Sequence, residues 1–292
     1  MSDARLRLFD ALEPGDNFWT AEIAAHGPEA TLSRILDGES LSSRRNLSKI
    51  RARLLERDLA TLQSEISTSG GRFITPESVE WPHQFEDLVA PPIGLVVRGE
   101  LPGCDAIALV GTRNPTPYGA RIASEFAAGF VDRQFDVISG GAYGIDSHAH
   151  RGALAAEGKT VAVLASGIST RYPAGNERLF EEILENGALI SEVMPTQRAR
   201  PERFLTRNRL IAALGRATIV VEAAFRSGSL RTARDAAELL RVVLAVPGPI
   251  TSPTSDGCHR LIGERAAEIV TSVSDALELI GARGCTLCGD GA

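Results

Sequence analysis

The sequence predicts an α/β fold, in which a doubly wound and mainly parallel sheet is preceded by a small all-helical N-terminal module. Short apolar runs that end at small residues alternate with helical periodicity from about residue 106 onward. These runs are apolar throughout, which is typical of parallel strands buried on both faces. Residues 1–70, in contrast, show helical spacing and lack β-branched runs. We therefore expect a helical module over 1–70, an α/β domain over 71–265, and a C-terminal helix with a flexible tail over 266–292.

The N-terminal module contains helical patterns near residues 5–12, 20–36 and 47–64, joined by turns at Pro14-Gly15 and Gly27-Pro28. Its later part holds a basic stretch, which consists of Arg44, Arg45, Lys49, Arg51, Arg53 and Arg57. A solvated helix face is the favoured interpretation of this stretch, and a secondary contact with nucleic acid is the alternative.

Residues 72–103 contain five prolines and predict an extended connector with little regular helix. Within this connector, residues 93–97 predict a strand that adds to the edge of the sheet. We expect the side chain of Trp81 to fill a gap between the two domains.

Strands and helices then alternate up to residue 246. The first strand, 107–110, stops at Gly111, and helical spacing runs from about Tyr118 to Phe130. Further strands are expected at 137–138, 160–164, 188–190, 217–221 and 242–246. Further helices are expected near 145, at 177–186, at 210–214 and from 227 to about 241. Crossovers of this kind place helices on the faces of the sheet, and ligands of such sheets bind at the carboxyl ends of the strands.

Three of these strands end in small or hydroxyl residues just where a helix begins. The loops are Gly111-Thr112-Arg113, Ser139-Gly140-Gly141 and Ser227-Gly228-Ser229. A helix N-terminus offers unpaired N–H groups and partial positive charge, and Arg113 adds a planar cation that suits phosphate. Two adjacent loops, one with an arginine, favour a phosphate-binding opening over glycines that only form tight turns. A serine of the third loop could also be an ordinary helix N-cap.

The known nucleotide fingerprints are absent from these loops. The first loop does not match G-x-G-x-x-G, the segment 140–144 lacks that spacing too, and no G-x-x-x-x-G-K-[ST] loop occurs. The sequence therefore predicts a Rossmann-like fold without indicating NAD or ATP, and we expect no cofactor.

The strongest local charge feature is the segment 198–216, which holds six arginines against one acid, Glu202. Arg207-Asn208-Arg209 lies where a helix is expected to begin, near the strand ends, and arginine both binds phosphate and stacks on bases. Phe204 beside them is a candidate platform for base stacking. For residues 198–203 a solvated loop is an equally favoured interpretation.

Several other polar residues could carry chemistry. Asp146 and His150 lie four residues apart, on one helix face with His148 near them, but no metal-site motif supplies a third ligand, so no metal is expected. We expect Asp146 to brace the glycine loop, and His150 to hydrogen-bond to that loop or to a ligand phosphate. Glu192 and Glu222 end strands and could act as a paired acid and base, although bracing of arginines is favoured.

The composition bears on the ligand and on the cellular compartment. Because the net charge is −6, an anionic ligand must be held by a local patch of positive charge. No apolar run is long enough for a membrane span, and the N-terminus lacks a secretion signal. Four cysteines without a signal favour free thiols in the cytoplasm, and the lone Cys285-x-x-Cys288 favours a frayed tail over a zinc site.

An ordered set of motifs links the chain to a known family. The motifs are Val110-Gly111-Thr112-Arg113 with Tyr118-Gly119, Ser139-Gly140-Gly141-Ala142 with Gly144-Ile145-Asp146, Ala149-His150, Ala153-Leu154, Tyr172-Pro173 with Asn176, Ser191-Glu192, Arg207-Asn208-Arg209, Val221-Glu222-Ala223, Ser227-Gly228-Ser229-Leu230 with Thr232-Ala233, and Ala245-Val246-Pro247-Gly248. Together they resemble the DNA-processing protein A family (DprA, also called Smf), from about Gly71 to Gly263.

The resemblance implies an extended Rossmann fold and a protein that binds single-stranded DNA without cutting it. It further implies protection of incoming DNA in natural transformation, help in loading a RecA-type recombinase, a homodimer, and an N-terminal module of the SAM or helix-hairpin-helix kind. The DNA-binding residues expected from the motifs and loops are Gly111, Thr112, Arg113, Ser139, Gly140, Gly141, Tyr143, Gly144, Asp146, His150, Phe204, Arg207, Asn208, Arg209, Ser227, Gly228, Ser229 and Thr232.

The sequence also departs from the family pattern. Ala174 stands where a basic residue often follows the Tyr-Pro pair, Tyr143 stands where arginine is frequent, and Phe204-Leu205 replaces Phe-Pro. Too few residues follow Gly263 for the winged-helix domain of many members, so none is expected here.

Two other functions remain possible on this sequence. A nucleotide phosphoribohydrolase of the cytokinin-activating (LOG-like) kind has a similar architecture, but its P-G-G-x-G-T-x-x-E loop is absent after Val221. A scaffold that only docks partners would explain the fold but not the arginine segment.

Overall fold

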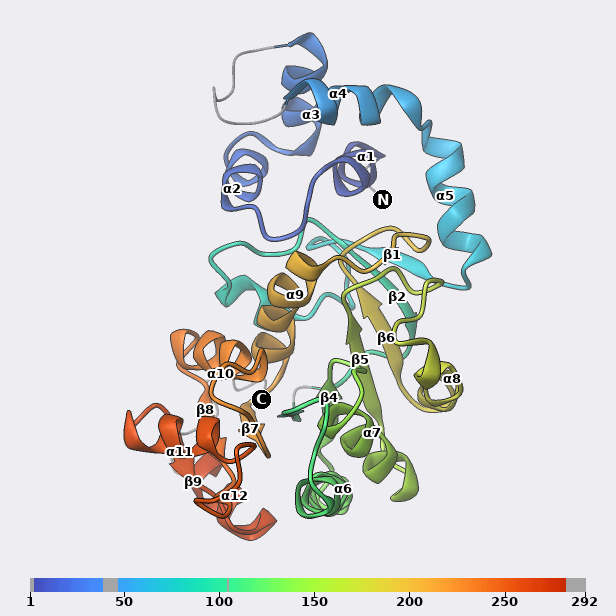
Figure 1. Cartoon of the computed structure of the whole chain (residues 1–292). Helices are drawn as coiled ribbons and strands as arrows, with labels where there is room; N and C mark the ends of the chain where they lie inside the picture. The colour runs from blue at the N-terminus through green and yellow to red at the C-terminus, as the bar shows by residue number, and fades with distance from the viewer. Residues whose placement is uncertain (1–2, 39–46, 104, 282–292) are drawn as a thin grey trace, which may run out of the picture.

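A computed structural model describes residues 3–38, 47–103 and 105–281, and nine strands of these residues form one sheet in the order β1-β2-β6-β5-β4-β3-β7-β8-β9 (Figure 1). The strands are β1 Arg72–Ile74, β2 Leu95–Gly99, β3 Ala106–Val110, β4 Asp136–Ser139, β5 Thr160–Leu164, β6 Ala188–Ser191, β7 Ala217–Val220, β8 Val242–Ala245 and β9 Glu268–Ile269. The predicted α/β fold with a mainly parallel sheet is therefore confirmed.

The strand β3 lies inside the sheet, between β4 and β7. Ala108 of β3 lies opposite Ile138 of β4 on one side and opposite Thr218 of β7 on the other, and both pairings are parallel. The chain runs outward from β3 through β4, β5 and β6, returns to β7 beside β3, and continues outward through β8 and β9. This reversal at β3 and β7 is the switch point at which doubly wound sheets bind ligands.

The connector forms the remaining edge of the sheet. The strand predicted at 93–97 is β2, which pairs antiparallel with β6 and is itself covered by the antiparallel β1. The helix η1 (His83–Asp87) brings Trp81 against Phe85, with ring centroids 5.6 Å apart. Trp81 packs into the apolar cluster of the sheet and α9, which contains no residue of the helical module. The expectation that Trp81 fills a gap between two domains is therefore wrong.

Helices cover both faces of the sheet. The helices after the connector are α6 Pro117–Val131, α7 Ile145–Ala155, η2 Ala174–Asn176, α8 Glu177–Glu185, α9 Pro201–Leu214, α10 Ser229–Glu238, α11 Asp256–Gly263 and α12 Val273–Gly281. One face packs against α9, α10 and α11, and the other packs against α6, α7, α8 and α12. The C-terminal helix was expected, whereas Cys285 and Cys288 lie outside the described residues. None of the described helices is long and apolar enough to cross a membrane.

The pattern at 5–12 corresponds to α1 Asp3–Ala11, whereas each of the two longer patterns is divided into two helices: α2 Asn17–His26 and α3 Pro28–Asp37, then α4 Leu47–Glu56 and α5 Leu59–Thr68. The expected turn at Gly27-Pro28 separates α2 from α3. The pattern over 47–64 is divided as well, because the Asp58 carboxylate accepts a hydrogen bond from the Thr61 amide at 2.8 Å and caps a new helix. Arg53 and Arg57 of the basic stretch bind the buried Asp10, so these two side chains do not form a solvated face.

The helical region arches over the end of the sheet that carries β1 and β2 (Figure 1). Leu6 and Phe9 of α1 share an apolar cluster with Phe73 of β1 and Val96 of β2. Polar contacts reinforce this packing at its rim. The Glu65 carboxylate of α5 accepts hydrogen bonds from the backbone N–H of Thr196 at 2.9 Å and from its hydroxyl at 2.7 Å, and it also pairs with Arg57.

The contact of Glu65 predicts acid sensitivity of this junction. Burial raises the pKa of Glu65, but the hydrogen bonds from Thr196 and Arg57 outweigh it, so the pKa lies below its ordinary value of 4.5. The stabilisation by Glu65 is therefore complete above pH 4.5 and is lost as the pH falls through the lowered folded-state pKa. We expect Glu65→Gln to lower the melting temperature at about pH 7 and to have a smaller effect at about pH 3, measured by thermal unfolding. An equal difference at both pH values would contradict the assignment.

Candidate functional site

A cleft of about 780 Å³ opens at the carboxyl ends of β3 and β7. A smaller pocket of about 30 Å³ adjoins it and shares Arg113, Ala142, Tyr172 and Phe204 with it. The cleft gathers most of the residues predicted from the sequence, namely Gly111, Thr112, Arg113, Asp146, Phe204, Arg207, Asn208, Ser227, Gly228, Ser229 and Thr232. Gly140 and Tyr143 line the smaller pocket. The loops that follow several separate strands thus meet in one opening.

The loop after β3 is fastened at both ends. The Thr112 N–H donates to the Glu222 carbonyl at 2.7 Å, and the Thr112 carbonyl accepts from the Ile145 N–H at 3.1 Å. Gly144 has φ +82°, and a Cβ there would lie 2.3 Å from the Thr112 carbonyl oxygen. A glycine is therefore required where the start of α7 meets this loop. The loop backbone is held in place, and the Arg113 side chain remains exposed.

Two of the three predicted anion cradles already contain a carboxylate of the chain itself. At the start of α6, Glu222 accepts hydrogen bonds from the Thr116 N–H at 2.9 Å and from the Thr116 hydroxyl at 2.6 Å. At the start of α7, Asp146 accepts from the Gly140 N–H at 3.1 Å and from the Ala142 N–H at 3.3 Å. These carboxylates lie at the N-termini of the two helices, where the partial positive charge of the helix dipole stabilises them. The bracing of the glycine loop by Asp146 is confirmed, whereas Glu222 braces hydroxyls and not an arginine.

The start of α10 differs, because no acidic residue lies in its first turn and no side chain caps it. The N-cap residue is Gly228, so neither serine is the expected N-cap. The Ser227 hydroxyl lies 2.7 Å from the Ser229 hydroxyl and accepts a hydrogen bond from the Ser229 N–H at 3.4 Å. Asn208 of α9 donates to the Gly228 carbonyl at 3.2 Å and ties the two helices together. Within the described part of the chain, α10 thus offers the cleft a helix N-terminus that no carboxylate of the chain occupies.

The arginine segment is more ordered than predicted. The helix α9 begins at Pro201, a position where the missing N–H of proline is tolerated, so the expectation that a helix begins near Arg207 is wrong. Arg207 therefore lies within α9 and is buried. Its guanidinium donates to the Gly140 carbonyl at 2.7 Å and to the Val163 carbonyl. Burial lowers the pKa of Arg207 to about 10, although the negative charge of Asp146 acts in the opposite direction and raises it. Arg207 therefore stays protonated at neutral pH.

Most other arginines of this segment also point into the protein. Arg209 pairs with the buried Glu192, with both carboxylate oxygens within 2.7 Å of one guanidinium nitrogen, and this confirms Glu192 as a brace for an arginine. Arg200 and Arg203 pair with Glu13 of the helical region at 3.0 Å and 2.9 Å. The structure thus does not bring Arg209 to the cleft. Of the segment 198–203, Arg198 and Arg200 are exposed in the loop before α9, whereas Arg203 is buried in the first turn of the helix, so a solvated loop describes only the start of this segment.

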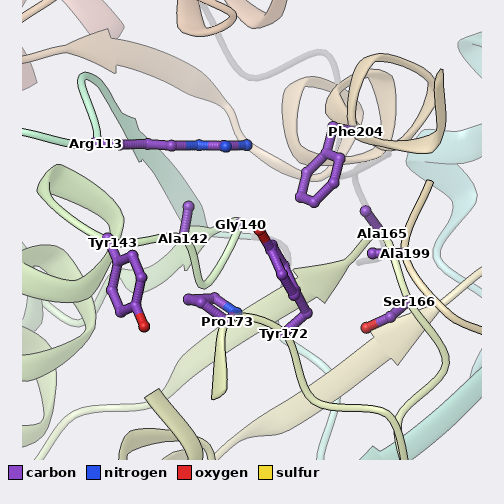
Figure 2. Close-up of a pocket in the computed structure, with 10 residues that line it drawn as sticks. All are labelled: Arg113, Gly140, Ala142, Tyr143, Ala165, Ser166, Tyr172, Pro173, Ala199 and Phe204. Atoms are coloured by element: carbon purple, nitrogen blue, oxygen red, sulfur yellow. The ribbon is translucent and has the colours of Figure 1, made fainter. Parts of the chain in front are cut away.

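Aromatic rings gather at the smaller pocket (Figure 2). The Arg113 side chain extends toward Phe204, with its guanidinium carbon 4.9 Å from the ring centroid. Tyr172 meets Phe204 edge to face at 5.6 Å, and it is half exposed, at 50%. Tyr143 is 49% exposed, and its hydroxyl accepts a hydrogen bond from the Gly175 N–H at 3.2 Å. Exposed rings beside a cation form a surface on which a planar base can stack.

Some predicted residues do not face either opening. His150 is buried, with Nδ1 2.7 Å from the Thr160 hydroxyl. Burial, with the charges of Arg207 and Arg151, lowers the pKa of His150 to about 3, so its ring is neutral and holds α7 to β5. Ser139 donates to the Leu109 carbonyl at 2.6 Å, and Gly141 packs against Phe180. No group of three potential metal ligands occurs among residues 3–38, 47–103 and 105–281.

Among the lining residues that the predicted set lacks, Tyr172 and Arg226 carry side chains that could stack on a base or bind a phosphate. Tyr172 lines both the cleft and the pocket, and it belongs to a motif that the sequence displays. Arg226 lines the cleft and is exposed. Its only sequence signal is its position after a strand end, beside the third loop.

A known protein family covers most of this chain. The family model of DNA recombination-mediator protein A matches residues 72–281. The chain belongs to this family. A Mycobacterium tuberculosis protein assigned as DNA processing protein DprA is 48% identical over 236 residues, 76% of this chain and 60% of the relative. The chain thus spans about 60% of the length of that relative. The DNA processing protein DprA of Streptococcus pneumoniae is 36% identical over 273 residues, 93% of this chain and 92% of that protein.

Solved structures of the family share the fold. The X-ray structure of DNA processing protein A from Streptococcus pneumoniae aligns with a TM-score of 0.81 and 31% identity, covering 95% of this chain and 98% of that one. A structure of DNA processing protein A from Helicobacter pylori aligns with a TM-score of 0.65 and 28% identity, covering 74% of this chain and 98% of that one. That structure was reported with insights into the single-stranded DNA binding mode of the Helicobacter pylori protein.

Two of the departures expected from the family resemblance, Tyr143 and Ala174, lie close together. The Tyr143 hydroxyl accepts a hydrogen bond from the N–H of Gly175, the residue that follows Ala174. Asn176 secures the same loop, since its side-chain amide donates to the Gly141 carbonyl at 2.9 Å. Tyr143 and Ala174 thus place an aromatic and a small side chain at the two positions where the resemblance leads us to expect cations.

The burial of Arg207 predicts a structural role that Arg113 lacks. We expect Arg207→Ala to lower the free energy of unfolding by about 3 kcal/mol, because it leaves two carbonyls and the buried Asp146 without their partner. Arg113→Ala removes an exposed side chain and should change stability by about 0.5 kcal/mol or less. Urea denaturation of both variants checks the contrast, and equal stabilities would show that Arg207 is not a structural residue.

Proposed function

We propose that this chain binds single-stranded DNA and does not cleave it. The observation that carries the proposal is that the cleft and its adjoining pocket combine two exposed arginines, Arg113 and Arg226, with the exposed rings of Tyr143 and Tyr172. Neither arginine pairs with a carboxylate of the described residues. Phosphates would lie at the arginines and at the open N-terminus of α10, and bases would stack at Tyr172 and Phe204. Binding of a flexible strand by a cationic groove and aromatic platforms is general among proteins of this type.

Support also comes from relatives. The Helicobacter pylori protein has a single-stranded DNA binding mode, and the family is described as a recombination mediator. We therefore extend the proposal to protection of incoming DNA in natural transformation and to loading of a RecA-type recombinase by a homodimer in the cytoplasm. For this chain these partners are inferred from its family.

The absence of catalysis is part of the proposal. Glu222 is the carboxylate that ends β7, where the alternative phosphoribohydrolase requires its catalytic loop. Its side chain is only 2% exposed and accepts hydrogen bonds from Thr116 and Thr254. A carboxylate held in this way is poorly placed to act on a bound nucleotide. Release of free base from a nucleoside monophosphate would favour the enzyme.

Arg113 tests the phosphate contacts. We expect Arg113→Ala to weaken binding of a labelled single-stranded oligonucleotide and to reduce the slope of log K against log salt by about 0.7, the release expected for one phosphate contact on a single strand. Arg133→Ala is the matched control, because Arg133 is exposed beyond the far end of the 15-residue helix α6. Fluorescence anisotropy at several salt concentrations, with a duplex of the same sequence alongside, measures both effects. Equal slopes for the wild type and Arg113→Ala would show that Arg113 does not contact a DNA phosphate.

Tyr172 tests base stacking. Replacement by alanine removes a ring that contributes about 1–3 kcal/mol when a base stacks on it, so we expect at least about five-fold weaker binding. Tyr172→Phe keeps the ring and should bind like the wild type. An oligonucleotide with abasic sites supplies the second measurement, since it should bind the wild type and Tyr172→Ala equally. Equal losses on normal and abasic DNA would indicate a phosphate contact in place of stacking.

A further inference from the structure

The loop between α1 and α2, Glu13-Pro14-Gly15-Asp16, lies against α9 on a side that the DNA cleft does not use. We call it the 13–16 loop. The inference developed from it rests on the proposed function, because it concerns what holds the cleft in its binding shape. None of the residues that line the cleft or the smaller pocket comes from the described helical residues 3–38 and 47–68. The loop therefore reaches the site only through α9.

Glu13 makes the main polar contact of the loop. Its two carboxylate oxygens accept hydrogen bonds from Nε and Nη2 of Arg203 at 3.0 Å and 2.9 Å, a bidentate pair. Arg200 donates to the same carboxylate at 3.0 Å. Arg203 is only 6% exposed, and its remaining nitrogen donates to the Arg198 carbonyl at 3.3 Å. One carboxylate thus fixes both the first turn of α9 and the segment before it.

The backbone of the loop fits closely against the same helix. Gly15 has φ +71°, and a Cβ at this position would lie 2.5 Å from Cγ2 of Thr206 and 3.2 Å from Nε of Arg209. The loop also borders a cavity of about 10 Å³ beside Phe9, Ile93 and Glu192, close to what one water molecule needs. Any other residue at position 15 would push the loop away from α9.

The helix α9 links this contact to the cleft. It is 14 residues long, and Arg203 and Thr206 meet the 13–16 loop while Phe204, Arg207 and Asn208 line the cleft. Packed helices move as units, so a shift of one face of α9 also moves the other. The pocket at Phe204 measures only about 30 Å³, and its ring already contacts Tyr172 and Arg113. Small displacements of α9 therefore change the surface that meets a base.

We propose that Glu13 is a positioning residue for single-stranded DNA binding, which acts through Arg203 to hold Phe204 at the cleft. The helical region then controls the affinity of a site that it does not touch. A role of Glu13 in general electrostatics makes the opposite prediction, because removal of an acidic charge near the cleft raises the attraction for DNA. The sign of the change in affinity distinguishes the two.

The experiment compares variants of the whole chain with a labelled single-stranded oligonucleotide. We expect Glu13→Gln to bind about three- to ten-fold more weakly than the wild type, although the variant carries one negative charge less. Gly15→Ala leaves the charge unchanged and should weaken binding in the same direction. Glu80→Gln is the matched control, since it breaks the exposed ion pair with Arg72 on β1 at 2.8 Å and should bind like the wild type. Far-ultraviolet circular dichroism selects a temperature at which all variants are folded.

A double-mutant cycle shows whether Glu13 acts through Phe204. If it does, Glu13→Gln has little further effect in a Phe204→Ala background, whereas independent effects would add. Tighter or unchanged binding of Glu13→Gln and Gly15→Ala, or additive losses in the cycle, would overturn the inference. Failure of the wild type itself to bind single-stranded DNA would instead overturn the proposed function, so the two failures are distinguishable.

Discussion

The site depends on the backbone of Gly140, whose N–H and carbonyl both form hydrogen bonds to buried charged side chains. Its N–H donates to the Asp146 carboxylate and its carbonyl accepts from the Arg207 guanidinium. Asp146 belongs to α7 and Arg207 to α9, so this peptide joins helices on opposite faces of the sheet. Burial raises the pKa of Asp146, while the positive charge of Arg207 lowers it. Each charge therefore compensates the other in the protein interior, where an unpaired ion is costly.

This arrangement changes the interpretation of the loops. A small-residue loop before a helix is a general anion site, but only where the helix N-terminus is free. Here Glu222 and Asp146 fill the starts of α6 and α7, which makes these loops rigid and removes most of their attraction for phosphate. The start of α10 keeps its dipole open to the cleft. The three loops therefore have different functions, although their sequences look alike.

The fold was predictable because its strands obey a simple rule. Buried parallel strands are apolar throughout and end at small residues, so β3, β4, β5, β7 and β8 are visible in the sequence, and their loops must meet at one edge. The partners of the arginines were not predictable. Glu13 and Arg203 are separated by 190 positions, and Arg207 binds carbonyls that carry no sequence signal. Charged side chains suggest an exposed loop unless such distant partners are known, which is why the start of α9 was misplaced and His150 was assigned to the ligand.

Under the proposed function, the arginine segment therefore contributes to DNA binding mainly by building the site. Arg200 and Arg203 bind Glu13, Arg207 binds two carbonyls, Arg209 binds Glu192 and Arg216 pairs with Asp105. The exposed cations of the cleft, Arg113 and Arg226, come from the loops after β3 and β7, whereas Arg207 lines the cleft as a buried side chain. With so few exposed cations in the cleft, the proposed DNA complex would gain less of its affinity from counterion release and more from stacking on aromatic rings. A site of this composition depends on how closely its rings are placed, and so on the packing of α9 between the sheet and the helical region.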